Sequence, residues 1–276
     1  MRRRLASLAR PAGDLGIPTA TNRIRSRGTA AVASSRMDQL VITDGTDTAT
    51  LAPRGEDWTL TVDVPDDEPE RRQRMLEAAA QAIGLQGGGR LQYWITRVHP
   101  TSDRIPVAAG FTPYRDLWRL RRSLPALPTT ISTRPFTTAD TEGFLDVNNR
   151  AFEWHPEQGG LTTDDLAAKQ AEAWYDPDGF RIWEHEGRIG GFCWTKVHSD
   201  VTPSLGEIYA VAVDPELRGR GLGRELTLAG LAWLSGQGLR HAILYVESDN
   251  RPANRVYEDL GFEHEFTSRA YQRTLR

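Results

Sequence analysis

Two kinds of apolar spacing alternate along the second half of the chain. Runs and alternations of β-branched and aromatic residues predict strands, whereas apolar positions three or four residues apart predict helices. The predicted strands cover 180–184, 190–197, 207–213 and 241–246. The predicted helices cover about 140–151, 162–174, 222–235 and a segment that begins at Asn250. This alternation predicts an α/β fold built on a mixed sheet.

The first half of the chain ends in the same order of elements as the second half. In each half a helical segment is followed by a strand, a short connection, a Gly-Phe pair and another strand. The first set is 68–83, 91–98, Gly110-Phe111 and 116–121. The second set is 222–235, 241–247, Gly261-Phe262 and 268–274. The correspondence predicts a tandem repeat of one α/β unit.

Composition divides the chain further. Residues 1–36 hold eight arginines and one acid, Asp14, which leaves −10 for residues 37–276 because the whole chain carries −3. We predict that 1–36 is a disordered head. It could be a transit segment, a nucleic-acid tail or the product of a misassigned start at Met1, and we favour the last because a strand, Gln39–Ile42, follows Met37 at once. The predicted domains are then 37–124 and 136–276, with a Pro- and Thr-rich linker over 125–135.

The remaining composition narrows the class of protein. Apolar runs are far shorter than the roughly 20 residues that span a bilayer. One cysteine, Cys193, and six scattered histidines provide no spacing for a metal site. The acidic body suits a cationic small substrate rather than a nucleic acid. We therefore expect a cytoplasmic monomer with no metal, membrane or nucleic-acid partner.

The segment from Val211 to Arg224 carries the main chemical signal. A predicted strand, an Asp-Pro turn and Arg-Gly-Arg-Gly-Leu-Gly lead directly into a helix. Glycines allow a ligand to approach the backbone, and the helix N-terminus offers unpaired N–H groups to an anion such as pyrophosphate. A Walker loop would need Gly-Lys-Ser/Thr, and a dinucleotide fingerprint would need a different glycine spacing.

This segment resembles the acyl-CoA loop of the GNAT acetyltransferases, Arg/Gln-x-x-Gly-x-Gly/Ala, through Arg218, Gly221 and Gly223. The resemblance implies a tandem GNAT fold whose N-terminal copy is truncated and degenerate, since Pro65-Asp66-Asp67-Glu68 precedes its helix and would repel phosphate. It also implies one active site per chain, with acetyl-CoA as co-substrate. The implied acetyl-CoA contacts are Val211, Ala212, Val213, Arg218, Gly219, Arg220, Gly221, Leu222, Gly223, Arg224, Asn250, Arg251, Pro252, Ala253, Asn254 and Arg255.

Three further strings, 155–159, 174–180 and 191–198, resemble the mycothiol synthase family within the GNAT enzymes, and the similarity covers nearly all of 125–276. It implies an acceptor, cysteinyl-glucosaminyl-inositol, whose free cysteine amine receives the acetyl group. The substrate contacts that the resemblance implies are Glu157, Lys196, Glu207 and Tyr245.

The residues predict direct transfer from acetyl-CoA to the amine. Backbone N–H groups of 211–213 would bind the developing oxyanion, Glu207 would accept the amine proton directly or through water, and Tyr257 would protonate the departing sulfur. Cys193 has no adjacent base and is not expected to act as a nucleophile. Two alternatives stay open: a GNAT enzyme for another small amine or a protein N-terminus, and a non-catalytic module that binds acetyl-CoA. A nucleic-acid binder is the least favoured interpretation.

Overall fold

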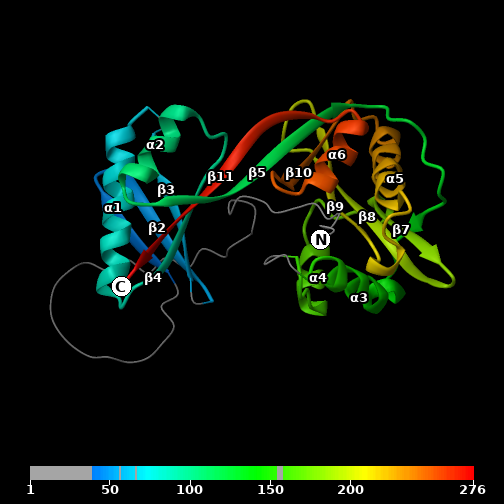
Figure 1. The fold of residues 1–276 in the computed structure, drawn as a ribbon, viewed down its shortest axis with the longest axis horizontal. Helices are drawn as coiled ribbons and strands as arrows, with labels where there is room; N and C mark the ends of the chain where they lie inside the picture. The colour runs from blue at the N-terminus through cyan, green and yellow to red at the C-terminus, as the bar shows by residue number, and fades with distance from the viewer. Residues whose placement is uncertain (1–38, 56, 66, 154–157) are drawn as a thin grey trace. The chain divides into compact units, whose positions relative to one another are not determined.

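A computed structural model describes residues 39–55, 57–65, 67–153 and 158–276 (Figure 1). The predicted disordered head, 1–36, lies outside these ranges, as does Glu157. Contacts between residues divide the chain into two compact units. We call residues 117–266 the C-terminal unit, and residues 39–116 together with 267–276 the N-terminal unit. Each unit has its own hydrophobic core, so each is described by itself.

The N-terminal unit is a sheet covered by helices. Its strands run in the order β1-β2-β3-β4-β11. The elements are β1 (Leu40–Asp44), β2 (Asp47–Arg54), β3 (Asp57–Asp63), α1 (Pro69–Leu85), β4 (Gly89–Ile95), α2 (Pro100–Ala108) and parts of β5 (Thr112–Ser123) and β11 (Glu263–Leu275). Helix α1 buries Met75, Leu76 and Ile83 against strand residues such as Leu51 and Leu91. This apolar stripe at helical spacing holds the helix on the sheet.

The C-terminal unit carries the larger core. Its strands run in the order β5-β10-β9-β8-β7-β6. The elements are β6 (Arg134–Pro135), η2 (Thr138–Asp140), α3 (Thr141–Ala151), α4 (Thr163–Gln170), η3 (Pro177–Gly179), β7 (Phe180–His185), β8 (Arg188–His198), β9 (Leu205–Val213), η4 (Pro215–Leu217), α5 (Leu222–Gly236), β10 (His241–Glu247) and α6 (Arg251–Asp259). The predicted α/β class with a mixed sheet is confirmed, because β9 and β10 are parallel whereas β8 and β9 are antiparallel.

Both faces of this sheet are covered by apolar side chains. On one face, Ile208 and Val211 of β9 pack with α5 and α6. On the other face, Tyr209 and Ala212 of β9 join a cluster of aromatic residues that includes Trp194 and residues of α3 and α4. Except at Tyr209 and Ala210, which both lie in the second core, the side chains of β9 alternate between two cores, and this fixes the register of the strand that leads into the glycine-rich loop.

The repeat is more complete than the sequence predicts. Helix α2 occupies the connection before Gly110, where the sequence analysis expected only a short loop, and it corresponds to α6 before Gly261. Both glycines have φ near +80°, and each following Phe donates its N–H to a carbonyl five residues earlier. Two prolines in the nine residues of α2 hid its helical pattern.

Two long strands, β5 and β11, each contribute residues to both units. Residues 269–275 of β11 pair with β4 of the N-terminal unit, whereas residues 117–123 of β5 pair with β10 of the C-terminal unit. The two units therefore differ from the two predicted domains at both of these strands. Residues 267–276, at the end of the predicted domain 136–276, belong to the N-terminal unit. Residues 117–124, at the end of the predicted domain 37–124, belong to the C-terminal unit. Hydrophobic periodicity marks a strand but not the unit to which each end belongs. The predicted linker, 125–135, contains β6 at its end.

Asp140 stabilises the start of α3. Arg134 donates to its carboxylate at 2.7 and 2.8 Å, and Thr137 donates from its N–H and its hydroxyl. Arg134 above all lowers the pKa of Asp140 from 3.8 to about 2. Since the folded state binds the proton less tightly than the unfolded state, the stabilisation is present above about pH 4 and is lost as the pH falls toward 2.

We therefore expect Asp140→Asn to lower the free energy of unfolding by about 2 kcal/mol at pH 7, with a smaller difference at pH 3. Urea denaturation at both pH values measures it, and the exposed Asp164→Asn serves as the control. An Asp140→Asn penalty of equal size at both pH values would contradict the ion pair as its source.

Candidate active site

Strands β9 and β10 separate at the middle of the C-terminal unit. Their parallel pairing covers only Gly206–Ile208 of β9 against Ala242–Leu244 of β10. Immediately after it, the pairing of β9 with β8 shifts register, because Trp194 faces Ala210 whereas Thr195 faces Ile208, so Tyr209 is the extra residue of a β-bulge. A bulge bends its strand and ends regular pairing. The main chain of 211–213 therefore leaves β10, as the predicted mechanism requires.

A narrow pocket lies at this separation. It is lined by Val211, Ala212, Val213, Gly223, Thr227, Val256 and Tyr257. The structure thus brings together the strand end, the first turn of α5 and the tyrosine of α6, which the sequence proposed separately as thioester, cofactor and leaving-group contacts. Tyr257 is 2% exposed and also packs edge-on against Phe262, so it has a structural role as well.

The glycine-rich loop adopts the backbone conformation that glycine favours. Gly219 and Gly221 have φ of 80° and 76°, and Gly221 caps the N-terminus of α5. Residues 219–221 are exposed, and a Cβ at either glycine would meet no protein atom within 4 Å. The first N–H groups of a helix have no partner within the helix, and they lie at the positive end of its dipole. This turn can accept an anion from solvent.

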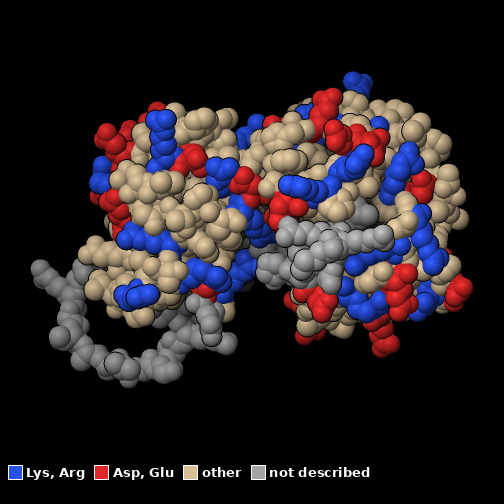
Figure 2. All heavy atoms as spheres, in the orientation of Figure 1, with Lys and Arg blue, Asp and Glu red and all other residues tan. Residues whose placement is uncertain are grey.

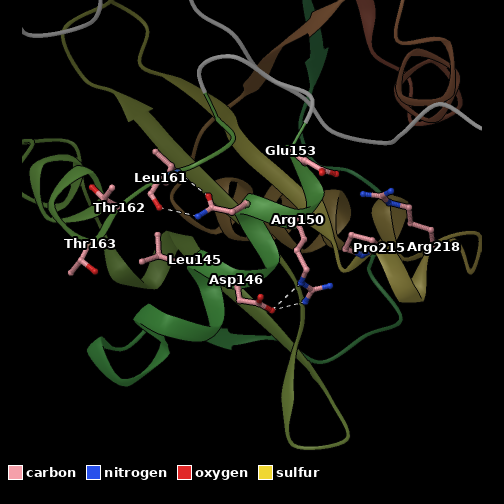
Figure 3. A pocket seen from close by; sticks show the side chains of 10 residues that line it. Leu145, Asp146, Arg150, Glu153, Leu161, Thr162, Thr163, Pro215 and Arg218 are labelled. Carbon is pink, nitrogen blue, oxygen red and sulfur yellow. Dashed lines mark hydrogen bonds and ion pairs between the residues drawn. The ribbon is translucent and has the colours of Figure 1, made fainter.

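The side chains of the loop arginines point elsewhere. Arg218 is half-buried and lines a second, wider pocket of about 810 Å3 together with α3, the start of α4 and Pro215 (Figure 3). Arg224 pairs with Glu225 at 2.8 Å, and Arg220 is exposed. In the wider pocket Arg150 is paired with Asp146 and Asp214. The loop therefore presents main-chain groups to a ligand more directly than it presents guanidinium groups.

The start of α6 forms the other rim of the site. Asn250 is buried and caps the helix by accepting the N–H of Ala253 at 3.4 Å. The amide of Asn254 donates to the carbonyls of Glu247 and Ser248, which closes the turn after β10. Pro252 lies in the first turn, whereas Arg251 and Arg255 are exposed. The predicted cofactor contacts in 250–255 thus include two amides that also hold the local structure.

The predicted acceptor contacts share one face of the sheet. Lys196 of β8 is directly opposite Glu207 of β9, and Glu207 is opposite Ile243 of β10. Because side chains alternate along a strand, Tyr245 lies on the same face as Ile243. Glu207 is fully buried and Lys196 is 7% exposed, with its ammonium 4.9 Å from the ring centre of Trp174. Three of the four predicted contacts therefore converge, and Glu157 lies outside the described residues.

Sequence reasoning missed His198. Its Nε2 lies 2.6 Å from Oε2 of Glu207, since β8 and β9 form an antiparallel pair that returns after a turn. The residue stands at the end of the string that carried the family resemblance, but no spacing rule links positions 198 and 207. Lys169 on α4, which donates to the hydroxyl of Tyr209 at 2.8 Å, was missed for the same reason.

Cys193 is poorly suited to nucleophilic catalysis. The thiol is buried against Gly230, and a Cβ on that glycine would lie 2.4 Å from the sulfur. Burial raises the pKa of the Cys193 thiol to about 12, so the reactive thiolate is disfavoured at neutral pH. The burial and the raised pKa of this thiol thus favour direct transfer of the acetyl group over a mechanism with an acyl-enzyme intermediate.

Other ligand classes find less support in the described ranges. His, Cys, Asp and Glu side chains there form no group of three or more that could hold a metal ion. Within those ranges, no helix combines the length and apolar composition that crossing a membrane requires. Figure 2 shows acidic and basic side chains interspersed over each unit on the visible face. A nucleic-acid surface would instead gather basic residues into a stripe or patch.

Comparison with known proteins gives a consistent result. The family model described as "Acetyltransferase (GNAT) family" matches residues 145–262. A mycothiol acetyltransferase of Thermobispora bispora is 44% identical over 205 residues, which cover 70% of each chain. A mycothiol acetyltransferase of Kocuria rhizophila is 38% identical over 252 residues, covering 86% of this chain and 82% of that one.

Solved structures agree on the fold. A GCN5-related N-acetyltransferase from Sphaerobacter thermophilus matches with a TM-score of 0.70 at 18% identity, over 83% of this chain and 77% of that chain. A tandem GNAT protein from the clavulanic acid biosynthesis pathway matches with a TM-score of 0.61 at 16% identity, over 85% and 81%. The predicted tandem GNAT fold is confirmed by this likeness.

Proposed function

The chain belongs to the mycothiol acetyltransferases of the GNAT family, and from this we propose that it transfers the acetyl group of acetyl-CoA to the cysteine amine of cysteinyl-glucosaminyl-inositol. This is the last step of mycothiol biosynthesis as the family resemblance implies it. The observation that carries the proposal is the narrow pocket, where the end of β9, the first turn of α5 and Tyr257 meet.

Acetyl-CoA fits the two ends of this site in a definite direction. The diphosphate would lie on the main-chain N–H groups of 219–223, where the helix dipole favours negative charge. The pantetheine arm would run into the separation between β9 and β10, and the N–H groups of 211–213 would polarise the thioester carbonyl. Asn250 to Arg255 would line the opposite rim, close to the arm.

The acceptor would lie on the polar face formed by Lys196, Glu207 and Tyr245. A polyhydroxylated acceptor needs fixed donors and acceptors, and its ammonium needs a carboxylate. We assign that carboxylate to Glu207, and we assign Lys196 and Tyr245 to hydroxyl groups of the acceptor. Glu157 would contribute a second acid from the segment between α3 and α4.

Three proton transfers complete the reaction. Glu207 accepts a proton from the ammonium, which frees the amine lone pair to attack the thioester carbonyl. The negative charge that develops on the carbonyl oxygen is held by the N–H groups of 211–213. The carbon–sulfur bond then breaks, the thiolate takes a proton from the hydroxyl of Tyr257, and the nitrogen of the new amide releases its second proton, which restores the Tyr257 phenol. Tyr257 lines the pocket and is almost fully buried, so its hydroxyl can act in a site from which water is excluded.

The test is a direct assay with purified protein, acetyl-CoA and the cysteinyl pseudo-disaccharide, in which product mass and CoA release are both measured. A mass increase of one acetyl group on the cysteine amine supports the proposal. Equal or faster transfer to simple amines or peptide N-termini would favour a GNAT enzyme of different specificity. Binding of acetyl-CoA without any CoA release would favour a sensor module.

A single acetyl-CoA should bind per chain, because the counterpart site of the N-terminal unit is filled. The parallel strands β3 and β4 pair over 57–60 and 90–93, as β9 and β10 do in the other unit. Arg72 of α1 bridges them by donating to the carbonyl of Val64 and, at 3.3 Å, to the hydroxyl of Tyr93. We infer that this guanidinium obstructs the space that a pantetheine arm would need, and acidic Glu68 and Glu70 lie at the helix start where a diphosphate would bind.

Isothermal titration calorimetry should therefore give a stoichiometry of one acetyl-CoA per chain. The variant Gly221→Val, which alters the loop of the C-terminal unit, should weaken that binding event and reveal no second one. A stoichiometry of two in the parent protein would contradict the closed site in the N-terminal unit.

A further inference from the structure

His198, at the partly exposed edge of the site, contacts Glu207 at its buried centre. Glu207 is fully buried, whereas the His198 side chain is 18% exposed. The 2.6 Å separation of Nε2 and Oε2 is short for a nitrogen–oxygen hydrogen bond. An ionised carboxylate can only accept, so Nε2 of His198 carries the hydrogen in this pair.

Burial makes such a donor necessary. A carboxylate removed from water favours its neutral form, which cannot take a proton from an amine. A hydrogen bond donated to the charged form acts in the opposite direction and keeps the group ionised. It also fixes the plane of the carboxylate and leaves other lone pairs for the acceptor amine, since a carboxylate has about four acceptor positions.

The neighbouring strands contribute few other ionisable groups to this face. On β8, Lys196 is directly opposite Glu207, and its ammonium lies over Trp174. On β10, Tyr245 and the buried Glu247 lie on the same face, and on β9 the hydroxyl of Tyr209 accepts from Lys169. His198 is in direct hydrogen-bond contact with the Glu207 carboxylate.

We propose that His198 is a positioning residue for Glu207: its Nε2–H orients the carboxylate and keeps it ionised, so that Glu207 can accept the proton of the acceptor ammonium. The inference rests on the proposed function. In the step itself one N–H bond of the ammonium breaks and one O–H bond forms on Glu207, while His198 keeps its own proton. The proton leaves Glu207 for solvent after the product departs.

The experiment compares the pH dependence of kcat/KM in the parent and in His198→Ala. Loss of the donor should move the acidic limb of the profile to higher pH by about one to two units, because a hydrogen bond to a charged group is lost. At neutral pH kcat/KM should fall at least about tenfold, whereas the affinity for acetyl-CoA should stay within about twofold. His198→Gln should restore most of the profile, because its amide nitrogen lies as far along the side chain as Nε2 and can donate in its place.

The matched control is His185→Ala. His185 is also a half-buried histidine at a strand end beside a glutamate, 3.9 Å from Glu186, but it stacks on Trp183 away from this face. It should keep the parent profile. A uniform loss of rate at every pH, or no rescue by glutamine, would overturn the positioning role. If Glu207→Gln itself keeps parent activity, the base assignment fails; if Glu207→Gln is inactive and His198→Ala keeps the parent profile, only the present inference fails.

Discussion

Glu207→Gln lowers kcat by about 10²- to 10⁴-fold, the range that general-base catalysis contributes in enzymes. The amide has nearly the same shape as the carboxylate but cannot accept the amine proton at neutral pH. Because Glu207 is fully buried between β8 and β10, bulk water does not surround its carboxylate and cannot accept the amine proton in its place. Acetyl-CoA affinity should change by less than about twofold, since the proposed cofactor site lies on the main chain of 211–213 and 219–223.

Stopped-flow or coupled measurement of CoA release provides kcat, and calorimetry provides the affinity. The exposed strand residue Glu263 offers the matched change, and Glu263→Gln should behave as the parent. A Glu207→Gln enzyme with the parent rate and pH profile would remove this residue from the base role and return the assignment to Glu157.

Gly221→Val weakens acetyl-CoA binding by about 10- to 100-fold, the loss expected when one hydrogen bond to a charged group is broken. Gly221 has φ of 76°, a conformation that a β-branched residue adopts only at a cost, and its Cα lies at the helix N-terminus where we propose that the diphosphate binds. In the protein alone a Cβ there meets nothing within 4 Å, so the cost to stability should come from backbone strain and not from a steric clash.

Gly238→Val is the matched control for this substitution. Gly238 follows the other end of the same helix, has φ of 77° and also has open space around its Cβ position. The two variants should lose similar stability in thermal unfolding, but only Gly221→Val should lose acetyl-CoA affinity. If calorimetry gave Gly221→Val and Gly238→Val the same acetyl-CoA affinity, the diphosphate would bind elsewhere and the proposed cofactor site would be wrong.

The two experiments together separate the halves of the reaction. One acts on proton transfer with the cofactor bound, and the other acts on cofactor binding with the base intact. Because Glu207 lies on β9 and Gly221 lies at the start of α5, and because the two changes act on different steps, their effects on kcat/KM should be close to additive.

The sequence by itself determined the fold class and the chemistry of the loop. The order of elements, the Gly-Phe repeat and the Arg218, Gly221 and Gly223 pattern are local properties, because they depend on residues a few positions apart. The structure accordingly has α5 starting at Leu222, and its loop glycines have the positive φ that glycine tolerates. The same is true of Asn250, whose position before Pro252 marks a helix start.

Tertiary structure alone decided which residues from distant parts of the sequence are in contact. His198 meets Glu207 because two strands pair antiparallel, Arg72 bridges β3 and β4 because α1 folds back on them, and 267–276 joins the N-terminal unit because β11 pairs with β4. No period or motif encodes these contacts, since each joins residues through strand register and helix packing. The sequence therefore predicts which groups perform the chemistry, whereas the packing of the sheet decides which side chains lie beside those groups.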